Sequence, residues 1–104
     1  MDKKVMFAGE ECTIKWYRYT HGGSIAMQLW CSEGPMCRAT VNIPNLRLAP
    51  DEVVIKDYSE NHGVQEALIK AGIIEDTGET ACCGYAICSI CKLLVIPDKV
   101  EVIA

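Results

Sequence analysis

One segment of the sequence, residues 57–72, has the pattern of an α-helix. It limits the fold more than any other feature, because the rest of the chain has the pattern of strands and turns. Apolar side chains recur in this segment at positions i, i+3, i+4 and i+7, the spacing of one buried helix face. They are Val64, Ala67, Leu68 and Ala71. A lone amphipathic helix must bury this face against another element, and the sequence offers only strands for that purpose.

Both ends of the helix have sequence signals. We expect Ser59 to be the N-cap, with Asn61 as the competing candidate, because either side chain can accept a hydrogen bond from a free backbone N–H. Gly72 suits the left-handed position that follows a helix, and Ile73 would then close against Leu68. The sequence therefore predicts a helix with defined start and end points.

Alternating apolar and polar residues predict most of the strands, and the last long one, residues 85–95, is apolar on both faces like a central strand. They cover residues 4–7, 12–17, 25–31, 37–43, 53–56, 80–83 and 85–95, with residues 100–103 as either a short edge strand or a loose tail. Turn residues separate them at 8–10, 20–24, 32–35 and 76–78. The apolar set of one sheet face consists of Ile14, Trp16, Ile25, Met27, Leu29, Ala39 and Val41. We expect an α+β fold in a single domain, residues 1–104, with an antiparallel β-sheet and one amphipathic helix packed on one face.

Composition and charge exclude some classes of function. The net charge is −4, so we do not expect bulk DNA binding, which needs clustered Lys and Arg. The longest apolar run, residues 93–96, is too short to cross a bilayer, and the first residues lack the apolar region of a signal peptide. We therefore expect a cytoplasmic protein without membrane contact, whose seven cysteines are mostly reduced.

The opposite face of the predicted sheet mixes aromatic rings with cations and amides. It consists of Lys15, Tyr17, Tyr19, Gln28, Trp30, Arg38, Thr40 and Asn42. Such a face can stack bases or bind a protein partner, since aromatic residues and Arg dominate binding hot spots. The competing interpretation is that the C-terminal strands cover this face, or that the aromatic residues are simply good strand formers. The predicted binding residues are Lys15, Tyr17, Tyr19, Trp30, Arg38 and Asn42.

Cys88 and Cys91 have the C-x-x-C spacing of zinc and redox sites, and Cys82 and Cys83 lie nearby in the sequence. Residues i and i+3 of a strand point to opposite faces, so the pair could share a metal only if the strand broke into a turn. A redox pair would also favour a helix N-terminus, where a thiolate is stabilised. A small zinc or redox module is therefore an alternative function, and buried reduced thiols are the default.

The two histidines, His21 and His62, lie in no recognised catalytic motif. His21 is in a glycine-rich turn between strands. His62 lies near Asp57 and Glu60 at the start of the predicted helix, where it could form an acid–base pair. A small enzyme that uses His62 with one of these carboxylates is the second alternative.

Six segments together carry a resemblance to a known family. They are GSIAMQL (23–29), EGP (33–35), ATVNIP (39–44), KDYSEN (56–61), AGI (71–73) and TG (77–78). In these segments the chain resembles a family of small uncharacterised proteins encoded by phages, plasmids and conjugative elements. The family has no assigned activity and no catalytic residues, so the resemblance implies a genomic setting. Small proteins of mobile elements often bind and block a host defence component, which is an argument by analogy.

We therefore expect a non-enzymatic binding protein of a phage or mobile element. It would inhibit a host defence system by occluding a host protein or by sequestering a small ligand. We expect no cofactor. The edge strand at residues 4–7 offers a surface through which a homodimer could form.

Overall fold

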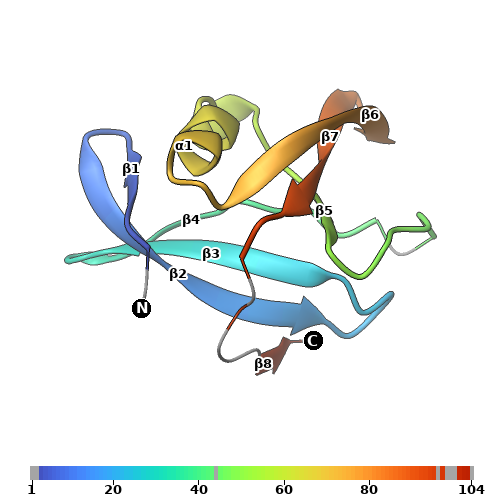
Figure 1. The fold of residues 1–104 in the computed structure, drawn as a ribbon, viewed down its shortest axis with the longest axis horizontal. Coiled ribbons are helices and arrows are strands. Elements are labelled where there is room, and N and C mark those ends of the chain that lie inside the picture. Colours follow the sequence, from blue (N-terminus) through green and yellow to red (C-terminus); the bar gives the residue numbers. More distant parts are fainter. Residues whose placement is uncertain (1–2, 44, 96, 98–100, 104) are drawn as a thin grey trace.

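The structure, a computed structural model, describes residues 3–43, 45–95, 97 and 101–103. Within these residues the strands form two sheets, and one short helix lies beside them (Figure 1). The strands are β1 (Val5–Phe7), β2 (Glu10–Tyr19), β3 (Ile25–Cys31), β4 (Gly34–Arg38), β5 (Glu52–Val54), β6 (Ile74–Cys83), β7 (Ala86–Leu93) and β8 (Glu101–Ile103). A 3₁₀ turn, η1 (Ser59–Asn61), precedes the helix α1 (Val64–Lys70).

The predicted α+β class is confirmed, since strands dominate the chain and α1 is short. The edge-strand alternative for the C-terminal segment is also confirmed for residues 101–103, because β8 pairs with β2 in parallel, whereas Val100 lies outside the described residues. The other strand pairs are antiparallel. No helix among the described residues has the length and apolar character needed to cross a membrane.

The first sheet places β1, β2, β3 and β4 in sequence order. Ile14 lies opposite Leu29 and Trp16 opposite Met27, so these four side chains share one face. This face lies in or against the main core, as the alternation predicts. Val41, which we expected on the same face, packs instead in a second, smaller cluster.

The second sheet contains β5, β7 and β6 in that order. The predicted turn at residues 76–78 is wrong, because β6 runs through them with a bulge in its pairing to β7. The Thr77 hydroxyl donates to the Ile90 carbonyl (2.6 Å), and the Gly78 N–H donates to Asp76 Oδ1 (2.9 Å). The turn-forming residues therefore bend a continuous strand instead of ending it.

The segment that follows β4 joins the two sheets. The Ala39 N–H donates to the Met27 carbonyl of β3 (2.8 Å), and the Val41 N–H donates to the Val54 carbonyl of β5 (3.0 Å). Consecutive parts of the segment thus pair with different sheets. The predicted strand at residues 37–43 is wrong for this reason: β4 ends early, and the chain then crosses to the second sheet.

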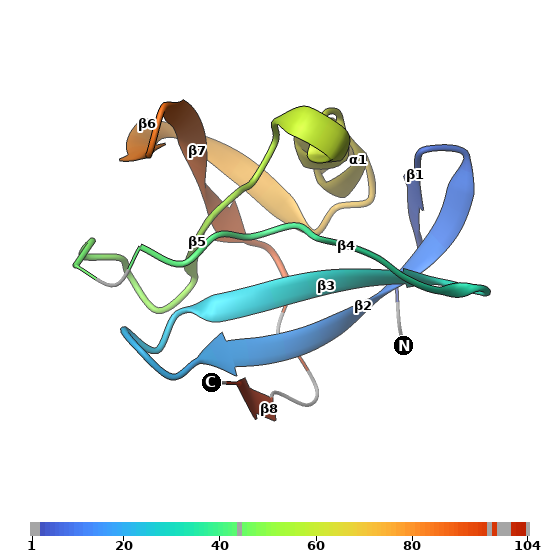
Figure 2. The same cartoon turned by 180° about the vertical axis from the view of Figure 1, so that it is seen from behind.

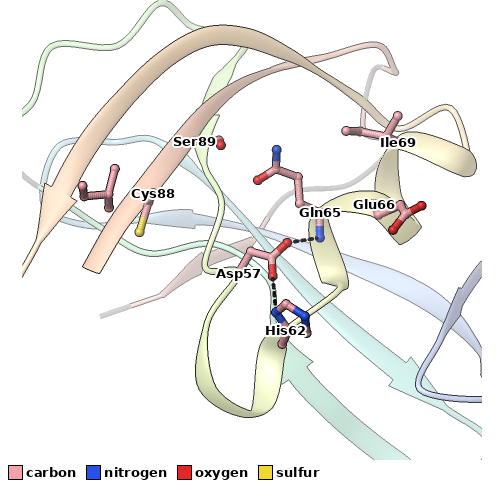
Figure 3. A pocket seen from close by; sticks show the side chains of 8 residues that line it. Asp57, His62, Gln65, Glu66, Ile69, Cys88 and Ser89 are labelled. Atoms are coloured by element: carbon pink, nitrogen blue, oxygen red, sulfur yellow. Dashed lines mark hydrogen bonds and ion pairs between the residues drawn. The ribbon is translucent and has the colours of Figure 1, made fainter. Parts of the chain in front are cut away.

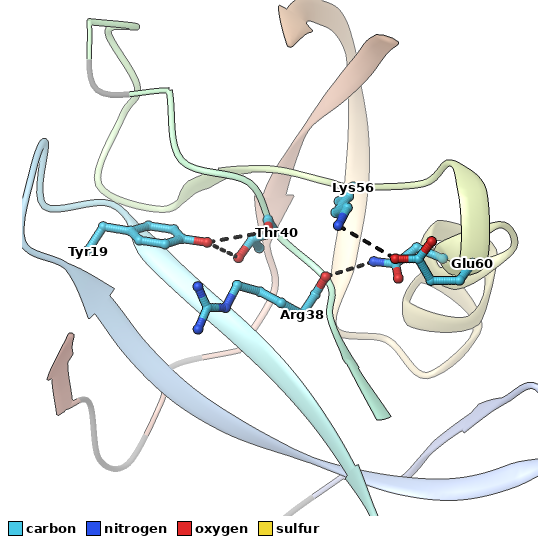
Figure 4. A network of polar contacts seen from close by, with 6 residues as sticks. Tyr19, Arg38, Thr40, Lys56 and Glu60 are labelled. Atoms are coloured by element: carbon cyan, nitrogen blue, oxygen red, sulfur yellow. Dashed lines mark hydrogen bonds and ion pairs between the residues drawn. The ribbon is translucent and has the colours of Figure 1, made fainter. Parts of the chain in front are cut away.

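Thr40 fixes this junction from inside the protein, where it is 2% exposed. Its Oγ1 accepts a hydrogen bond from the Met27 N–H (3.2 Å) and lies 3.1 Å from the Tyr19 hydroxyl. The Tyr19 hydroxyl also donates to the Thr40 carbonyl (3.3 Å; Figure 4). Tyr19 belongs to β2 and Met27 to β3, so one side chain ties two strands of the first sheet to the segment that crosses to the second. Buried hydrogen bonds of this kind are costly to break, because the group left behind has no access to water.

The C-terminal end of the helix follows the prediction. The Gly72 N–H donates to the Ile69 carbonyl and the Ile73 N–H to the Leu68 carbonyl, each at 3.0 Å. Gly72 has a φ of 76°, a left-handed conformation that glycine adopts without strain. These two bonds are the Schellman closure that the sequence indicates.

The predicted N-cap is wrong. Ser59 begins the 3₁₀ turn with a φ of 55°, and its side chain does not cap a helix. Asp57 does: one carboxylate oxygen accepts from the Gly63 N–H (2.8 Å) and the other from the Gln65 N–H (3.2 Å). The inserted 3₁₀ turn brings Asp57 back to the start of α1, which local capping patterns do not describe.

The helix lies beside one outer strand of each sheet, since its strand neighbours are β1 and β6. Its buried residues Val64 and Leu68 join a core cluster to which both sheets contribute. Figures 1 and 2 show α1 and the β6–β7 hairpin on the same side of β2 and β3. The expected packing of the helix across the face of a single sheet is not confirmed.

Replacing Thr40 with Val tests the junction. The variant keeps a side chain of similar shape but leaves the Met27 N–H and the Tyr19 hydroxyl without their side-chain partner. We expect the free energy of unfolding to fall by about 2 kcal/mol, measured by urea denaturation. Tyr19→Phe should cost about 1 kcal/mol, and the double variant should cost less than the sum because the two groups share one network.

The matched control is Thr80→Val, which removes the same hydroxyl from an exposed position on β6. Its free energy of unfolding should stay within about 0.5 kcal/mol of the parent. If Thr40→Val unfolds at the same urea concentration as this control, the junction does not depend on the hydroxyl.

Candidate functional site

The predicted binding face is the outer face of the first sheet. Lys15, Gln28 and Arg38 are register partners across β2, β3 and β4, so their side chains form one row. Lys15 and Arg38 are exposed and Gln28 is half-buried. The described C-terminal strands therefore do not cover this row, and two cations remain open to solvent.

Trp30 lies next to this row and is held by Lys15. The Lys15 Nζ is 3.8 Å from the centroid of the Trp30 ring, a cation–π contact. Trp30 is half-buried, and its Nε1 is enclosed without a hydrogen-bond partner in the part of the chain that the structure describes. Packing and the Lys15 charge thus hold the indole in place, without a hydrogen bond to its Nε1 from the described residues. Lys15 already occupies one face of the ring.

The two predicted tyrosines have different positions. Tyr17 is half-buried and stays at the surface of the outer face. Tyr19 is 8% exposed, because its side chain reaches across to Thr40 at the junction. The Arg38 guanidinium carbon is 6.0 Å from the centroid of the Tyr19 ring, and Figure 4 shows both side chains in this arrangement. Tyr19 therefore packs beneath the Arg38 side chain, and its ring has little exposed surface left for a partner.

Two asparagines fix the backbone around the face. Asn42 Nδ2 donates to the His21 carbonyl in the turn between β2 and β3 (3.1 Å). Asn61 is 1% exposed, and its Nδ2 donates to the Arg38 carbonyl at the end of β4 (2.7 Å). The alternative prediction of Asn61 as a helix cap is wrong, because its side-chain amide donates to the last carbonyl of β4 instead. Of the six predicted binding residues, four lie at the surface of the outer face: Lys15, Tyr17, Trp30 and Arg38. Tyr19 is buried, and Asn42 bonds to the turn between β2 and β3.

The cysteines do not gather into a metal site. Cys88 packs with Val54 and Ile90 in the second cluster, whereas Cys91 lies in the main core. The C-x-x-C pair therefore points to opposite faces of β7. All seven cysteines are free. In the described segments, no group of three or more His, Cys, Asp or Glu residues could hold a metal ion, so the geometry gives the zinc alternative no support.

Burial suppresses the reactivity of the core thiols. It raises the pKa of Cys91 to about 12, with a smaller contribution from Asp76, and the pKa of Cys37 to about 11, with a contribution from Cys12. Burial likewise raises the pKa of Cys88 above its usual value. A thiol with a raised pKa is protonated at neutral pH and is a poor nucleophile. These residues act as core side chains.

A pocket of about 430 Å³ lies on another part of the surface, between the start of α1 and β7 (Figure 3). It is lined by Asp57, His62, Gln65, Glu66, Ile69, Ile87, Cys88 and Ser89. The His62 side chain is 91% exposed, and its Nδ1 is 3.8 Å from Asp57 Oδ1. Both Asp57 oxygens also accept backbone N–H groups. Capping of α1 thus accounts for the position of this carboxylate without an acid–base role.

Sequence reasoning identified Asp57 and His62 but missed the apolar wall of this pocket. Ile69 lies on α1 outside the stripe of buried residues and is 41% exposed. Ile87 lies on β7 and is 74% exposed. A large apolar residue outside the periodic buried set is the signal that could have indicated these positions.

Comparisons of this chain with protein-family models, with curated proteins and with solved structures find no match.

The raised thiol pKa values predict how stability depends on alkaline pH. In the folded protein burial raises the pKa of Cys91 to about 12, whereas in the unfolded chain its pKa is the ordinary 9.0 of an exposed thiol. Its contribution is fully present below pH 9 and is lost as the pH rises from there toward 12, because the unfolded state releases the proton first. We expect the free energy of unfolding to fall across this window.

Cys91→Ala should reduce that fall, although the small cavity lowers stability at every pH. The control Cys82→Ala removes an exposed thiol and should leave the slope unchanged. Equal slopes for the two variants, measured by urea denaturation at each pH, would show that the Cys91 thiol is not the group that titrates.

The capping role of Asp57 is tested by paired substitutions in the pocket. Asp57→Ala should lower the free energy of unfolding by about 1 kcal/mol, because the backbone N–H of Gly63, just before α1, and that of Gln65, in its first turn, lose their acceptor. His62→Ala should change it by less than about 0.5 kcal/mol, since that side chain is almost fully exposed. Thermal denaturation of both variants measures this. If the two substitutions cost the same, the Asp57–His62 ion pair and not the cap explains the carboxylate.

Proposed function

We propose that the chain is a non-enzymatic binding protein that acts through the outer face of its first sheet. The observation that carries this proposal is the row formed by Lys15, Gln28 and Arg38, in which both cations are exposed, one on each side of the central strand β3. The chain as a whole has a net charge of −4, so this row is a local positive surface on an acidic protein. A rigid sheet supports it, which lowers the entropy lost on binding.

The partner that fits best is a protein surface that carries carboxylates. Arg and Lys form charge-assisted hydrogen bonds with carboxylates, and aromatic rings beside them add apolar contact area. Stacking of nucleic-acid bases on Trp30 is less favourable, because Lys15 must first leave one face of the ring. The exposed part of Tyr17 and the half-buried Trp30 provide the apolar contacts next to the two cations.

The resemblance to proteins of phages, plasmids and conjugative elements suggests where to seek the partner. In that setting the binding protein works in the host cytoplasm, and its target is a host defence component that it occludes. A homodimer through β1 remains a prediction. That edge is only three residues long and lies beside α1, which limits the surface it offers to a second copy.

The test reverses the charge of the row. The chain is immobilised, exposed to a lysate of a bacterial host, and the retained proteins are quantified by mass spectrometry. A protein retained by the parent should be lost with Lys15→Glu/Arg38→Glu. With the purified partner, the affinity should fall on the order of 100-fold, because two charge-assisted contacts are lost.

The matched control is Lys4→Glu/Arg47→Glu, which changes the net charge by the same amount at two exposed positions outside the row. It should retain the partner as the parent does. The proposal fails if the two double variants retain the same proteins in the same amounts while both remain folded.

A further inference from the structure

Four side chains form an exposed patch on the β6–β7 hairpin and the neighbouring helix, which we call the hairpin patch. It consists of Ile69, Cys82, Tyr85 and Ile87. Tyr85 is fully exposed at the turn between β6 and β7, and Ile87 is 74% exposed. Large apolar side chains gathered at the surface mark interaction sites more often than chance, because leaving them in water is unfavourable.

The register of the hairpin places these side chains together. Cys82 of β6 is the direct partner of Ile87 on β7, so both point to the same face. Tyr85 lies in the turn that joins these two strands, two residues before Ile87. Ile69 of α1 lines the same pocket as Ile87, which connects the helix to the hairpin.

Carboxylates border the apolar surface on the pocket side. Asp57 and Glu66 line the pocket, and neither Lys nor Arg is among the lining residues. Figure 3 shows Glu66 and Ile69 on α1, with Asp57 beside the start of the helix. Glu66 pairs with Lys70 at 3.4 Å, and both side chains are about three-quarters exposed. An exposed pair of this kind is weak and exchanges readily for another partner.

We propose that the hairpin patch and the adjoining pocket bind a segment of a partner protein in which apolar residues alternate with Lys or Arg. The apolar residues of the segment would cover Ile87 and Tyr85, and a basic side chain would enter the pocket beside Glu66 and Asp57. Charge complementarity selects this occupant. A second copy of the chain would bring the same carboxylates face to face, which is repulsive.

This site is independent of the outer face. No residue is shared with the row of Lys15, Gln28 and Arg38, and the charge is of opposite sign. The chain would therefore have two contact surfaces, one for an acidic partner and one for a basic apolar segment. Loss of either interaction leaves the other testable.

The experiment uses three short fluorescent peptides of equal length, measured by fluorescence anisotropy with the full chain. In the first, Leu alternates with Lys; in the second, Glu replaces each Lys; in the third, Ser replaces each Leu. We expect the first to bind with a dissociation constant on the order of micromolar, and the other two to bind at least about tenfold more weakly.

Substitutions locate the site. Ile87→Ser and Glu66→Lys should each weaken binding of the Leu–Lys peptide by about tenfold. The controls are Met6→Ser, an exposed apolar residue on β1, and Glu33→Lys, an exposed acid in the turn before β4. Both should bind like the parent. Bound peptide should also slow the reaction of Cys82 with a maleimide, followed by peptide mapping.

The proposal is overturned by any of four results. They are binding of no peptide, equal binding of the Leu–Lys and Leu–Glu peptides, equal affinity of Ile87→Ser and Met6→Ser, and a dimer of the chain in which Cys82 is protected without peptide. Because the Lys15→Glu/Arg38→Glu variant retains the hairpin patch, it should bind the Leu–Lys peptide normally even if the outer face has no partner.

Discussion

Thr40 lies where the chain leaves one sheet and enters the other. Its Oγ1 bonds to β2 and β3 of the first sheet, and the next residue, Val41, donates its N–H to the Val54 carbonyl of the second. The bond to the Met27 N–H stabilises β3 at the point where β4 has ended. The contact with Tyr19 draws that side chain across the sheet. Because the junction is buried, water cannot replace these bonds, and the relative position of the sheets depends on them. The orientation of α1 follows, since it packs against one outer strand of each sheet.

The same junction determines which residues of the first sheet are available to a partner. Tyr19 is drawn inward, and Arg38 lies above its ring as the last residue of β4. The Arg38 carbonyl is held by the buried Asn61, so the backbone beneath the guanidinium is fixed while the side chain remains exposed. A binding residue with a fixed backbone and a free side chain needs little reorganisation to meet a partner. The buried residues Asn61 and Tyr19 thus fix the position of Arg38 on the outer face before any partner binds.

Features that depend on local sequence were predictable, and features that depend on tertiary contacts were not. Alternation placed Lys15 and Trp30 on one face, and Gly72 marked the helix end, because both signals concern neighbours in the sequence. The cap by Asp57 was missed because it reaches α1 over an inserted 3₁₀ turn. Tyr19 was expected at the surface because alternation gives the face of a side chain but not how far its ring extends along the sheet. The hairpin patch was missed because the strand pattern at residues 80–83 and 85–95 does not show which of its apolar side chains stay exposed.

The parallel pairing of β8 with β2 has a consequence for how the chain folds during synthesis. Tyr17, Arg18 and Tyr19 pair with residues 101–103, so this edge of β2 stays open until those residues have left the ribosome. Hairpins such as β2–β3 can form early because their contacts are local, whereas the β2–β8 contact must close a long loop. Until that loop closes, the nascent chain carries an unpaired strand edge, the state in which β proteins most readily associate with one another.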